Sequence, residues 1–295
     1  MDWDDLRVFL AVARSESLSG AGKSLKLDPA TVGRRIARLE DAVGARLFLK
    51  SPQGYTLTDQ GTGLIPHAES AESALVGARE ALSGPEGLTG QIRIGAPDGC
   101  ANYLLPQVLA AICDENPGLE VQIVALPRVF NLSKREADLA IAVSRPEAGR
   151  LTVQKLTDYQ LHLAASREYL ARHPAITDLA QLHDHRLVGY IADMIFDKEL
   201  DYLSQIGAGA VPLASNSVSV QLNWLRHGAG IGVVHDFALP SAPELVKLLP
   251  QTVHLTRAFW LIRHADDARA VRLNRFASRL ADGIRTEVQR LEALS

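Results

Sequence analysis

The 295-residue sequence lacks the features that mark several specialised protein classes. It has two cysteines, Cys100 and Cys113, so we expect no disulfide framework, and a reducing cytoplasm is the predicted compartment. Its longest apolar runs, such as 121–126 and 229–234, are far shorter than the ~18–20 residues of a membrane-spanning helix, so no membrane span is predicted. The first five residues are acidic where a secretory signal is basic, which argues against export.

An excess of positive charge is also missing. The formal net charge is −3, with 31 Lys and Arg against 34 Asp and Glu, so bulk charge does not indicate a polyanionic partner. Composition is that of a globular protein, and at ~100–200 residues per domain the length predicts two or three modules. Residues 23–50 nevertheless have a local net charge of +4, because three acidic residues face seven basic ones: Lys23, Lys26, Arg34, Arg35, Arg38, Arg46 and Lys50.

Three short helices are predicted in the first 50 residues. Helical spacing of apolar residues predicts a first helix that ends near Ser15, and Ser17 is an N-cap candidate for a second helix that reaches residue 25. The third helix has the strongest start signal, with Asp28 as N-cap and Pro29 at the first helical position. Gly44 is the expected stop.

The third helix is amphipathic. One face carries the apolar stripe Val32, Ile36, Leu39 and Val43. The opposite face carries Thr31, Arg34, Arg35 and Arg38. A solvated charged face is the default interpretation, but a short helix and a turn precede this helix, as they do in proteins that insert a recognition helix into the DNA major groove. We therefore favour DNA binding.

A hairpin and a long helix are predicted next. Residues 47–49 and 51–57 indicate two short strands around a Pro/Gly turn, a wing that would touch phosphate or the minor groove. Thr58 is the expected cap of the following helix, in which Pro66 predicts a kink or a late start. A heptad seam in this helix favours dimerisation over packing on its own domain, and its members are Leu64, Ala68, Ala71, Leu75, Ala78 and Leu82.

Residues 83–90 form the clearest hinge, and beyond it strands and helices alternate. The predicted strands are 91–95, 120–126, 138–143, 161–165, 187–190, 231–234 and 258–262. The predicted helices are 104–115, 132–136, 218–227 and 268–294. This alternation indicates an α/β region with a parallel sheet and helices on its faces.

Residues 6–61 resemble the N-terminal winged helix-turn-helix of LysR-type transcriptional regulators. The matching residues are Leu6, Phe9, Val12, Ser17-Leu18-Ser19, Ala21, Leu25, Asp28-Pro29-Ala30-Thr31-Val32-Gly33-Arg34-Arg35-Ile36, Leu39-Glu40, Gly44, Leu47-Phe48, Leu57-Thr58 and Gly61. The likeness continues through the hinge into 90–95, 137–141 and 228–232, so it covers almost the whole chain.

The resemblance implies a DNA-binding surface made of the third helix and the wing. Its residues would be Asp28, Pro29, Ala30, Thr31, Arg34, Arg35, Arg38, Lys50 and Gln53. Pro29 and Gly33 replace the family's usual glutamine and serine. Because amide and hydroxyl groups read bases or phosphates, these two changes affect which bases are read rather than DNA binding itself.

The resemblance also implies a two-lobed α/β effector domain like that of type 2 periplasmic-binding proteins, with a small molecule in the cleft. Asp98, Gly99 and Cys100 lie between the first strand and a helix, where backbone N–H groups can hold an anion. The other expected lining residues are Pro127, Val143, Ser144, Tyr190, Asn216, Ser217 and His235. Asp98 replaces a frequent hydroxyl residue and would repel a carboxylate effector unless it is bridged or protonated, which favours a ligand with a polar or cationic group.

The resulting domain prediction has four parts. Residues 1–58 form the DNA-binding domain, 59–83 the dimerising helix, 84–90 the hinge and 91–295 the effector domain. Lobe I would comprise 91–160 and 265–295, and lobe II 161–264. The expected partners are double-stranded DNA, a small-molecule effector and further copies of the chain in a dimer or tetramer. No metal or other cofactor is expected.

Other motifs have structural interpretations that we favour. Residues 228–232 lack the third glycine of a dinucleotide-binding fingerprint and precede a strand instead of following one. The triplet His183-Asp184-His185 has no further ligand cluster nearby, so an exposed loop is favoured over a metal site. Cys100 is read as a small pocket-lining residue rather than a redox sensor. The alternative to a regulator is a solute-binding or catalytic α/β protein with an appended helical domain, which would not require the basic helix and wing.

Overall fold

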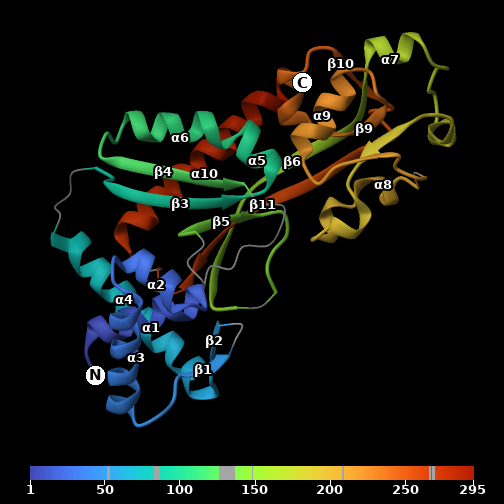
Figure 1. Cartoon of the computed structure of the whole chain (residues 1–295). Coiled ribbons are helices and arrows are strands. Elements are labelled where there is room, and N and C mark those ends of the chain that lie inside the picture. The colour runs from blue at the N-terminus through green and yellow to red at the C-terminus, as the bar shows by residue number, and fades with distance from the viewer. Residues whose placement is uncertain are drawn as a thin grey trace. The chain divides into compact units, whose positions relative to one another are not determined.

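The computed structural model describes residues 1–51, 54–82, 87–125, 137–147, 149–207, 209–265, 267 and 270–295. The chain divides into two compact units (Figure 1), of which the first consists mainly of residues 1–86 and the second of most of the remaining chain. Within the described ranges, no helix combines the length and the apolar character that crossing a membrane requires.

The N-terminal unit contains four helices and a hairpin in its described residues. They are α1 (Trp3–Ser15), α2 (Leu18–Leu25), α3 (Pro29–Val43), β1 (Phe48–Ser51), β2 (Gly54–Leu57) and α4 (Asp59–Leu82). Side chains cap the helices as predicted: Ser17 accepts a hydrogen bond from the Gly20 N–H at 3.3 Å, and Asp28 accepts one from the Thr31 N–H at 2.8 Å. Gly44 ends α3 with a φ of +68°, in the left-handed region that glycine tolerates.

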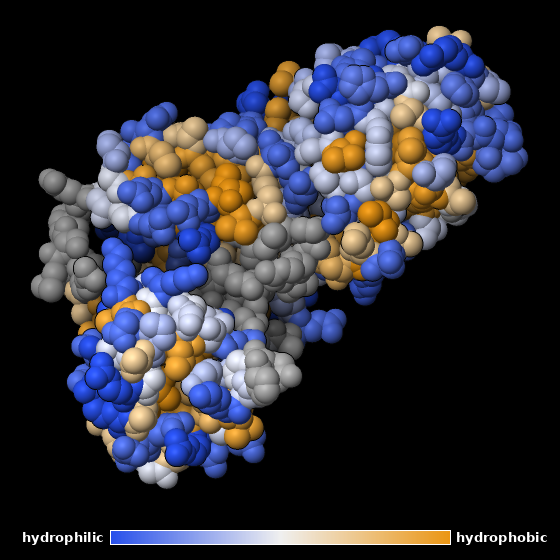
Figure 2. Space-filling view, viewed as in Figure 1, coloured by the Kyte–Doolittle hydropathy of each residue, from blue (hydrophilic) through white to orange (hydrophobic). Residues whose placement is uncertain are grey.

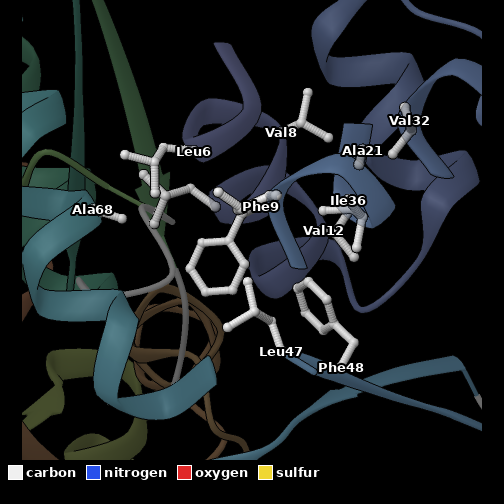
Figure 3. Close-up of a cluster of buried hydrophobic side chains, with 12 residues drawn as sticks. Leu6, Val8, Phe9, Val12, Ala21, Val32, Ile36, Leu47, Phe48 and Ala68 are labelled. Atoms are coloured by element: carbon white, nitrogen blue, oxygen red, sulfur yellow. The ribbon is translucent and has the colours of Figure 1, made fainter. Parts of the chain in front are cut away.

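One apolar core holds this unit together. The rings of Phe9 in α1 and Phe48 in β1 lie 5.4 Å apart, and Leu47 is enclosed beside them (Figure 3). Ile36 of α3 and Ala68 of α4 are buried in the same cluster. The hairpin and the long helix are therefore integral parts of the helix-turn-helix core.

The wing is an antiparallel hairpin in which Phe48 pairs with Leu57 and Ser51 pairs with Gly54. This confirms the two predicted strands. Helix α4 begins directly after Thr58, whose hydroxyl accepts a hydrogen bond from the Gly61 N–H at 3.0 Å. The helix continues through Pro66, so the late start that the proline predicted does not occur.

The C-terminal unit is built on a mixed sheet in the order β4-β3-β5-β11-β6-β9-β7-β8, with β10 beside β6. The strands are β3 (Gly90–Ala96), β4 (Leu119–Ala125), β5 (Leu139–Ala142), β6 (Leu151–Ser166), β7 (Leu187–Gly189), β8 (Leu213–Ala214), β9 (Ile231–His235), β10 (Leu245–Leu248) and β11 (His254–His264). Strand β3 is parallel to β4 and β5, and β7 is parallel to β8 and β9. The prediction of a parallel sheet is wrong for β6 and β11, which pair antiparallel with each other and with their neighbours.

Strands β6 and β11 are much longer than predicted and join two lobes. They pair with each other from Leu151–His264 to His162–His254. Strand β11 also pairs with β5, whereas the last residues of β6 pair with β9 on one edge and β10 on the other. The first lobe thus contains β3, β4 and β5, and the second contains β7, β8, β9 and β10.

Helices flank the sheet (Figure 1). They are α5 (Asp98–Tyr103), α6 (Leu105–Asp114), α7 (Arg167–Ala171), α8 (Tyr202–Gln205), α9 (Val218–Arg226) and α10 (Val271–Glu292). Helices α6 and α10 pack together, with a hydrogen bond of 2.8 Å from Gln107 to Glu287, and Glu292 accepts one from the Gln160 N–H at 2.7 Å. The predicted helix at 132–136 lies outside the described residues.

Strand β4 forms one edge of the sheet and leaves part of its apolar surface uncovered. Ile123 of β4 is 39% exposed. Figure 2 shows hydrophobic residues at the surface in the region of β3 and β4. An edge strand with exposed apolar residues is a surface on which another chain can pack.

Two glycines in the first turns of α4 predict opposite effects of alanine. A Cβ on Gly61 would lie 2.2 Å from the Leu47 carbonyl oxygen, whereas one on Gly63 would meet nothing within 4 Å. We expect Gly61→Ala to destabilise the N-terminal unit by about 1–3 kcal/mol, because the hairpin must move. Gly63→Ala should stabilise it by about 0.5–1 kcal/mol, because alanine is the better helix former. Denaturant unfolding of the full-length variants checks both, and equal effects would contradict the packing of α4 on the hairpin.

Candidate DNA interface and effector cleft

The first turn of α3 is a preformed, exposed surface. Asp28, Pro29 and Ala30 are exposed, and hydrogen bonds from the Thr31 side chain and N–H hold the pKa of Asp28 below its usual value. The Thr31 hydroxyl accepts a hydrogen bond from the guanidinium of Arg34 at 2.8 Å. Arg34 is itself exposed, so its charge is directed to the solvent at the start of the helix.

Arg35 and Arg38 point their charges toward α1. Arg38 makes two hydrogen bonds to Asp5, which is 2% exposed, and these bonds raise the pKa of Arg38. Arg35 lies 3.6 Å from a carboxylate oxygen of Asp4. Arg38 therefore compensates a buried carboxylate, a structural task that the sequence pattern did not reveal.

The wing is joined to α3 through Glu40. Its carboxylate accepts hydrogen bonds from the N–H groups of Leu47 at 2.8 Å and Phe48 at 3.3 Å, and Arg46 pairs with it at 2.7 Å. Burial alone would raise the pKa of Glu40, but these donors outweigh it and hold the pKa below the usual value. Lys50 is exposed on β1, and the predicted contact residue Gln53 lies outside the described residues.

The predicted heptad seam of α4 is buried in the N-terminal core at its start and exposed farther along the helix. Ala68 is fully enclosed in the N-terminal core and Leu64 packs against it, so Ala68 is not available to a partner, which corrects the prediction there. Farther along, Leu75 is 43% exposed and Ala78 is exposed, while Ala71 is half-buried. The side chain of Leu82 is outside the described residues. The helix is fastened to α1 by two hydrogen bonds from Arg14 to Glu72, at 2.7 and 3.1 Å.

A cleft between the two lobes of the C-terminal unit brings together most of the predicted effector residues. Its predicted lining residues are Asp98, Gly99, Cys100, Val143, Tyr190, Asn216 and His235. Its other lining residues are Pro97, Tyr159, Phe196, Leu200, Val218 and Phe259. The enclosed space is about 20 Å³, room for about one water molecule. Pro127 lies outside the described residues.

Two predicted cleft residues connect segments that are distant in the sequence. The Ser217 hydroxyl donates to Asp98 Oδ2 at 3.1 Å, and the Ser144 hydroxyl donates to Asp197. The Ser219 N–H, in the first turn of α9, also donates to Asp98 Oδ2 at 3.1 Å. Asp98 is therefore bridged to the second lobe, but by neutral donors that leave its negative charge uncompensated.

Aromatic rings fill the floor of the cleft. Tyr159 of β6 stacks on Phe259 of β11 at 4.2 Å and on His235 at 5.5 Å between ring centroids. Burial raises the pKa of Tyr159 and also that of Tyr202, which lies beside His235. Burial lowers the pKa of His235 to about 4, so its imidazole is uncharged at neutral pH. The cleft is a low-dielectric, mainly neutral environment.

Three residues that line the cleft, Tyr159, Phe196 and Phe259, are not predicted from the sequence. Tyr159 and Phe259 lie on adjacent strands whose register is set by long-range pairing, and the predicted strand at 161–165 begins only after Tyr159. The alternation of Tyr159, Leu161 and Leu163 is the signal that would have extended the predicted strand back to Tyr159. Burial raises the pKa of Cys100, which is fully enclosed, so its thiol favours the protonated form, in agreement with a pocket-lining role.

The two remaining motifs have structural explanations. A Cβ at Gly230 would lie 2.3 Å from the Arg186 carbonyl oxygen, so this glycine lets β9 approach the segment before β7. His183 is exposed as expected, but it lies in a 3₁₀ helix (Leu179–Asp184) and not in a loop. His185 is buried, with Nδ1 3.2 Å from the Tyr169 hydroxyl. Within the described ranges, no group of three or more side chains is arranged to hold a metal ion.

Sequence models of two domains match the chain. The model of the bacterial regulatory helix-turn-helix protein of the lysR family matches residues 3–62, and the model of the LysR substrate binding domain matches residues 85–285. The chain is 27% identical over 259 residues to the HTH-type transcriptional regulator PtxR of Pseudomonas aeruginosa, covering 85% of this chain and 82% of that protein. It is 24% identical over 290 residues to CrgA of Neisseria meningitidis, covering 95% and 96%.

Solved structures share the fold over nearly the whole chain. Full-length OxyR from Pseudomonas aeruginosa superposes with a TM-score of 0.73 at 20% identity, covering 97% of this chain and 98% of that one. LysG from Corynebacterium glutamicum, solved with bound effector Arg, gives a TM-score of 0.65 at 17% identity, covering 96% and 98%.

The basic recognition helix, the wing and the two-lobed domain define a DNA-binding transcriptional regulator with an effector-binding domain. The chain belongs to the LysR family of bacterial transcriptional regulators. This confirms the predicted family and fold class.

Glu40 provides a pH-dependent test of the wing attachment. Glu40→Ala leaves the buried N–H groups of Leu47 and Phe48 without their acceptor, so we expect a loss of about 2–3 kcal/mol at pH 7. Because the folded-state pKa is lowered, the carboxylate contributes above its unfolded pKa of about 4.3 and loses the contribution as pH falls through the folded value. Denaturant unfolding at pH 7 and pH 3 should show the difference from wild type shrinking at the lower pH.

The neighbouring exposed Asp41 supplies the control for Glu40. Asp41→Ala should change stability by less than about 0.5 kcal/mol. A Glu40→Ala loss no larger than that of Asp41→Ala would show that the carboxylate does not hold the wing.

Proposed function

We propose that this LysR-type regulator reads DNA with the first turn of α3, where Thr31 and Arg34 enter the major groove, and that Lys50 contacts the backbone at the wing. The observation that carries the proposal is the exposed Arg34 guanidinium, set at the start of α3 by its bond to Thr31. Arg35 would contact phosphate from the side of the helix. Arg38 is assigned a supporting role, because it already binds Asp5.

Arg34 and Arg38 should respond differently to alanine. Arg34→Ala should weaken DNA binding and, if the contact is to a phosphate, reduce the slope of log K against log salt by about one, with the melting temperature unchanged. Arg38→Ala should lower the melting temperature, because it leaves the buried Asp5 without its partner. A gel-shift salt titration paired with thermal unfolding separates the two. Unchanged binding of Arg34→Ala at all salt concentrations would contradict the assignment.

We propose that the exposed second half of α4 joins two copies of the chain. Leu75 and Ala78 continue the heptad seam after the helix leaves the N-terminal core, and Ala71 lies at the boundary. The apolar edge at β4 supplies a second surface, which would allow a dimer to form a tetramer. A twofold assembly would present two recognition helices to an interrupted inverted repeat in DNA.

A lysine on the seam should disrupt this assembly. We expect Leu75→Lys to shift the protein toward its 31.9 kDa monomer in sedimentation and to weaken DNA binding. Ser70→Lys places the same side chain at an exposed position on another face of α4 and should leave the assembly intact. Equal behaviour of the two variants would contradict the seam.

We infer that the effector acts by changing the arrangement of two lobes, which we propose to be 91–160 with 265–295 and 161–264. In this proposal the hinge at 84–90 relays the change to residues 1–83. A coupling of ~1–3 kcal/mol between effector and DNA would be sufficient. The bound Arg in LysG supports a small-molecule occupant of this fold. The same proposal includes a cytoplasmic location, no catalytic role and no cofactor.

Footprinting tests the proposal as a whole. The full-length protein should protect a site in DNA adjacent to its own gene, and an effector should change the length or the bending of that site. The absence of any protected site would favour a solute-binding or catalytic protein with an appended helical domain.

A further inference from the structure

Asp98 occupies a position where the two lobes meet. It follows β3 of the first lobe and begins α5, while both donors to its Oδ2 atom, the Ser217 hydroxyl and the Ser219 N–H, belong to the second lobe. Its Oδ1 atom accepts a further hydrogen bond from Asn102 at 3.1 Å. Asp98 is the carboxylate that bridges the lobes at this point.

The donors to Asp98 are those that an anionic ligand would use. Ser217 is the N-cap of α9, a nine-residue helix, and Ser219 is in its first turn. The N-terminus of a helix attracts anions through its unpaired N–H groups and its dipole. Here the chain's own carboxylate holds these groups, so a free carboxylate would have to displace Asp98 to reach them.

The rest of the cleft offers nothing to balance a second negative charge. Among the described residues that line it, none is a lysine or an arginine, and His235 is uncharged at neutral pH. Arg257 lies 5.8 Å from the centre of the Tyr202 ring, but it already binds Glu199 at 2.9 Å and Gln205 at 2.6 Å. A ligand carboxylate would therefore face Asp98 without compensation, and two carboxylates close together repel each other.

Neutral hydrogen-bonding groups remain available instead. Among the described residues, the buried Nδ1 atom of His235 has no hydrogen-bond partner, and the neighbouring Tyr159 hydroxyl interacts with that of Tyr202. Buried polar atoms are normally paired, so His235 Nδ1 indicates where a polar group of an uncharged or positively charged ligand can bind. The cleft is closed around Gly99, where a Cβ would lie 3.4 Å from the His235 ring.

We propose that Asp98 acts as an internal anion that fills the helix N-terminus of α9, closes the cleft without a ligand and reserves it for a non-anionic effector. The proposal rests on the proposed effector function of this cleft and names the chemical class of its ligand. Simple carboxylates are then excluded, because the chain supplies the carboxylate itself. An effector opens or rearranges the cleft by contacting the neutral groups beside the Asp98 bridge.

The experiment is a chemical rescue of the full-length protein. Asp98→Ala should melt at a lower temperature than wild type, and sodium acetate should restore about 2 °C or more of that loss in a saturable way, at constant ionic strength against sodium chloride. Acetamide, which has the shape of acetate without its charge, should not restore it. Wild type should show no saturable response to acetate, because its site is already filled.

Two further variants keep the test decisive. Asp98→Asn fills the site without a charge and should not respond to acetate. Asp98→Ser leaves room for acetate and should respond, which provides the result if the alanine variant does not fold. The proposal is overturned if acetate stabilises wild type as much as Asp98→Ser, if neither small variant responds to acetate, or if acetamide rescues as well as acetate.

The rescue does not depend on DNA. A wild-type protein that protects no DNA would therefore overturn the proposed regulatory function and leave the acetate result intact. If neither Asp98→Ala nor Asp98→Ser responds to acetate while the wild-type protein gives a normal footprint, only the proposal that Asp98 is an internal anion is overturned.

Discussion

The pairing of β6 with β11 is the constraint on which the effector domain depends. The two strands run side by side from Leu151–His264 to His162–His254, so they contribute to both lobes and fix how the lobes can meet. The same pairing places Tyr159 and Phe259 in contact under the cleft. The floor of the proposed effector cleft is thus part of the connection between the two lobes.

In the N-terminal unit, too, a small number of contacts sets the geometry of the proposed DNA-binding surface. Glu40 joins the end of α3 to the start of the wing, and Arg38 joins α3 to α1 through a buried carboxylate. Ala68 brings the linker helix into the same core. The proposed DNA-binding surface is therefore held in place by side chains that do not themselves need to touch DNA.

The local features of the fold were predictable because neighbouring residues produce them. The caps at Ser17 and Asp28, the stop at Gly44 and the hairpin after Leu47 depend on interactions within a few residues. The strands at 161–165 and 258–262 were predicted too short, and the sheet was predicted parallel, because strand length and direction depend on partners about 100 residues away. Most of the cleft was found through the family resemblance, whereas its aromatic floor was not.

The sequence by itself determined the class of protein: a basic amphipathic helix after a short helix and a turn, a wing, a heptad helix and an alternating α/β region. It also placed Asp98 after the first strand of the effector domain. Only the tertiary structure decided what these residues do, because it brings Asp5 to Arg38, Ala68 into the core, and Ser217 and Ser219 to Asp98. Charge in a sequence is a local property, but whether a charge is free, paired or bridged depends on which distant segment folds against it.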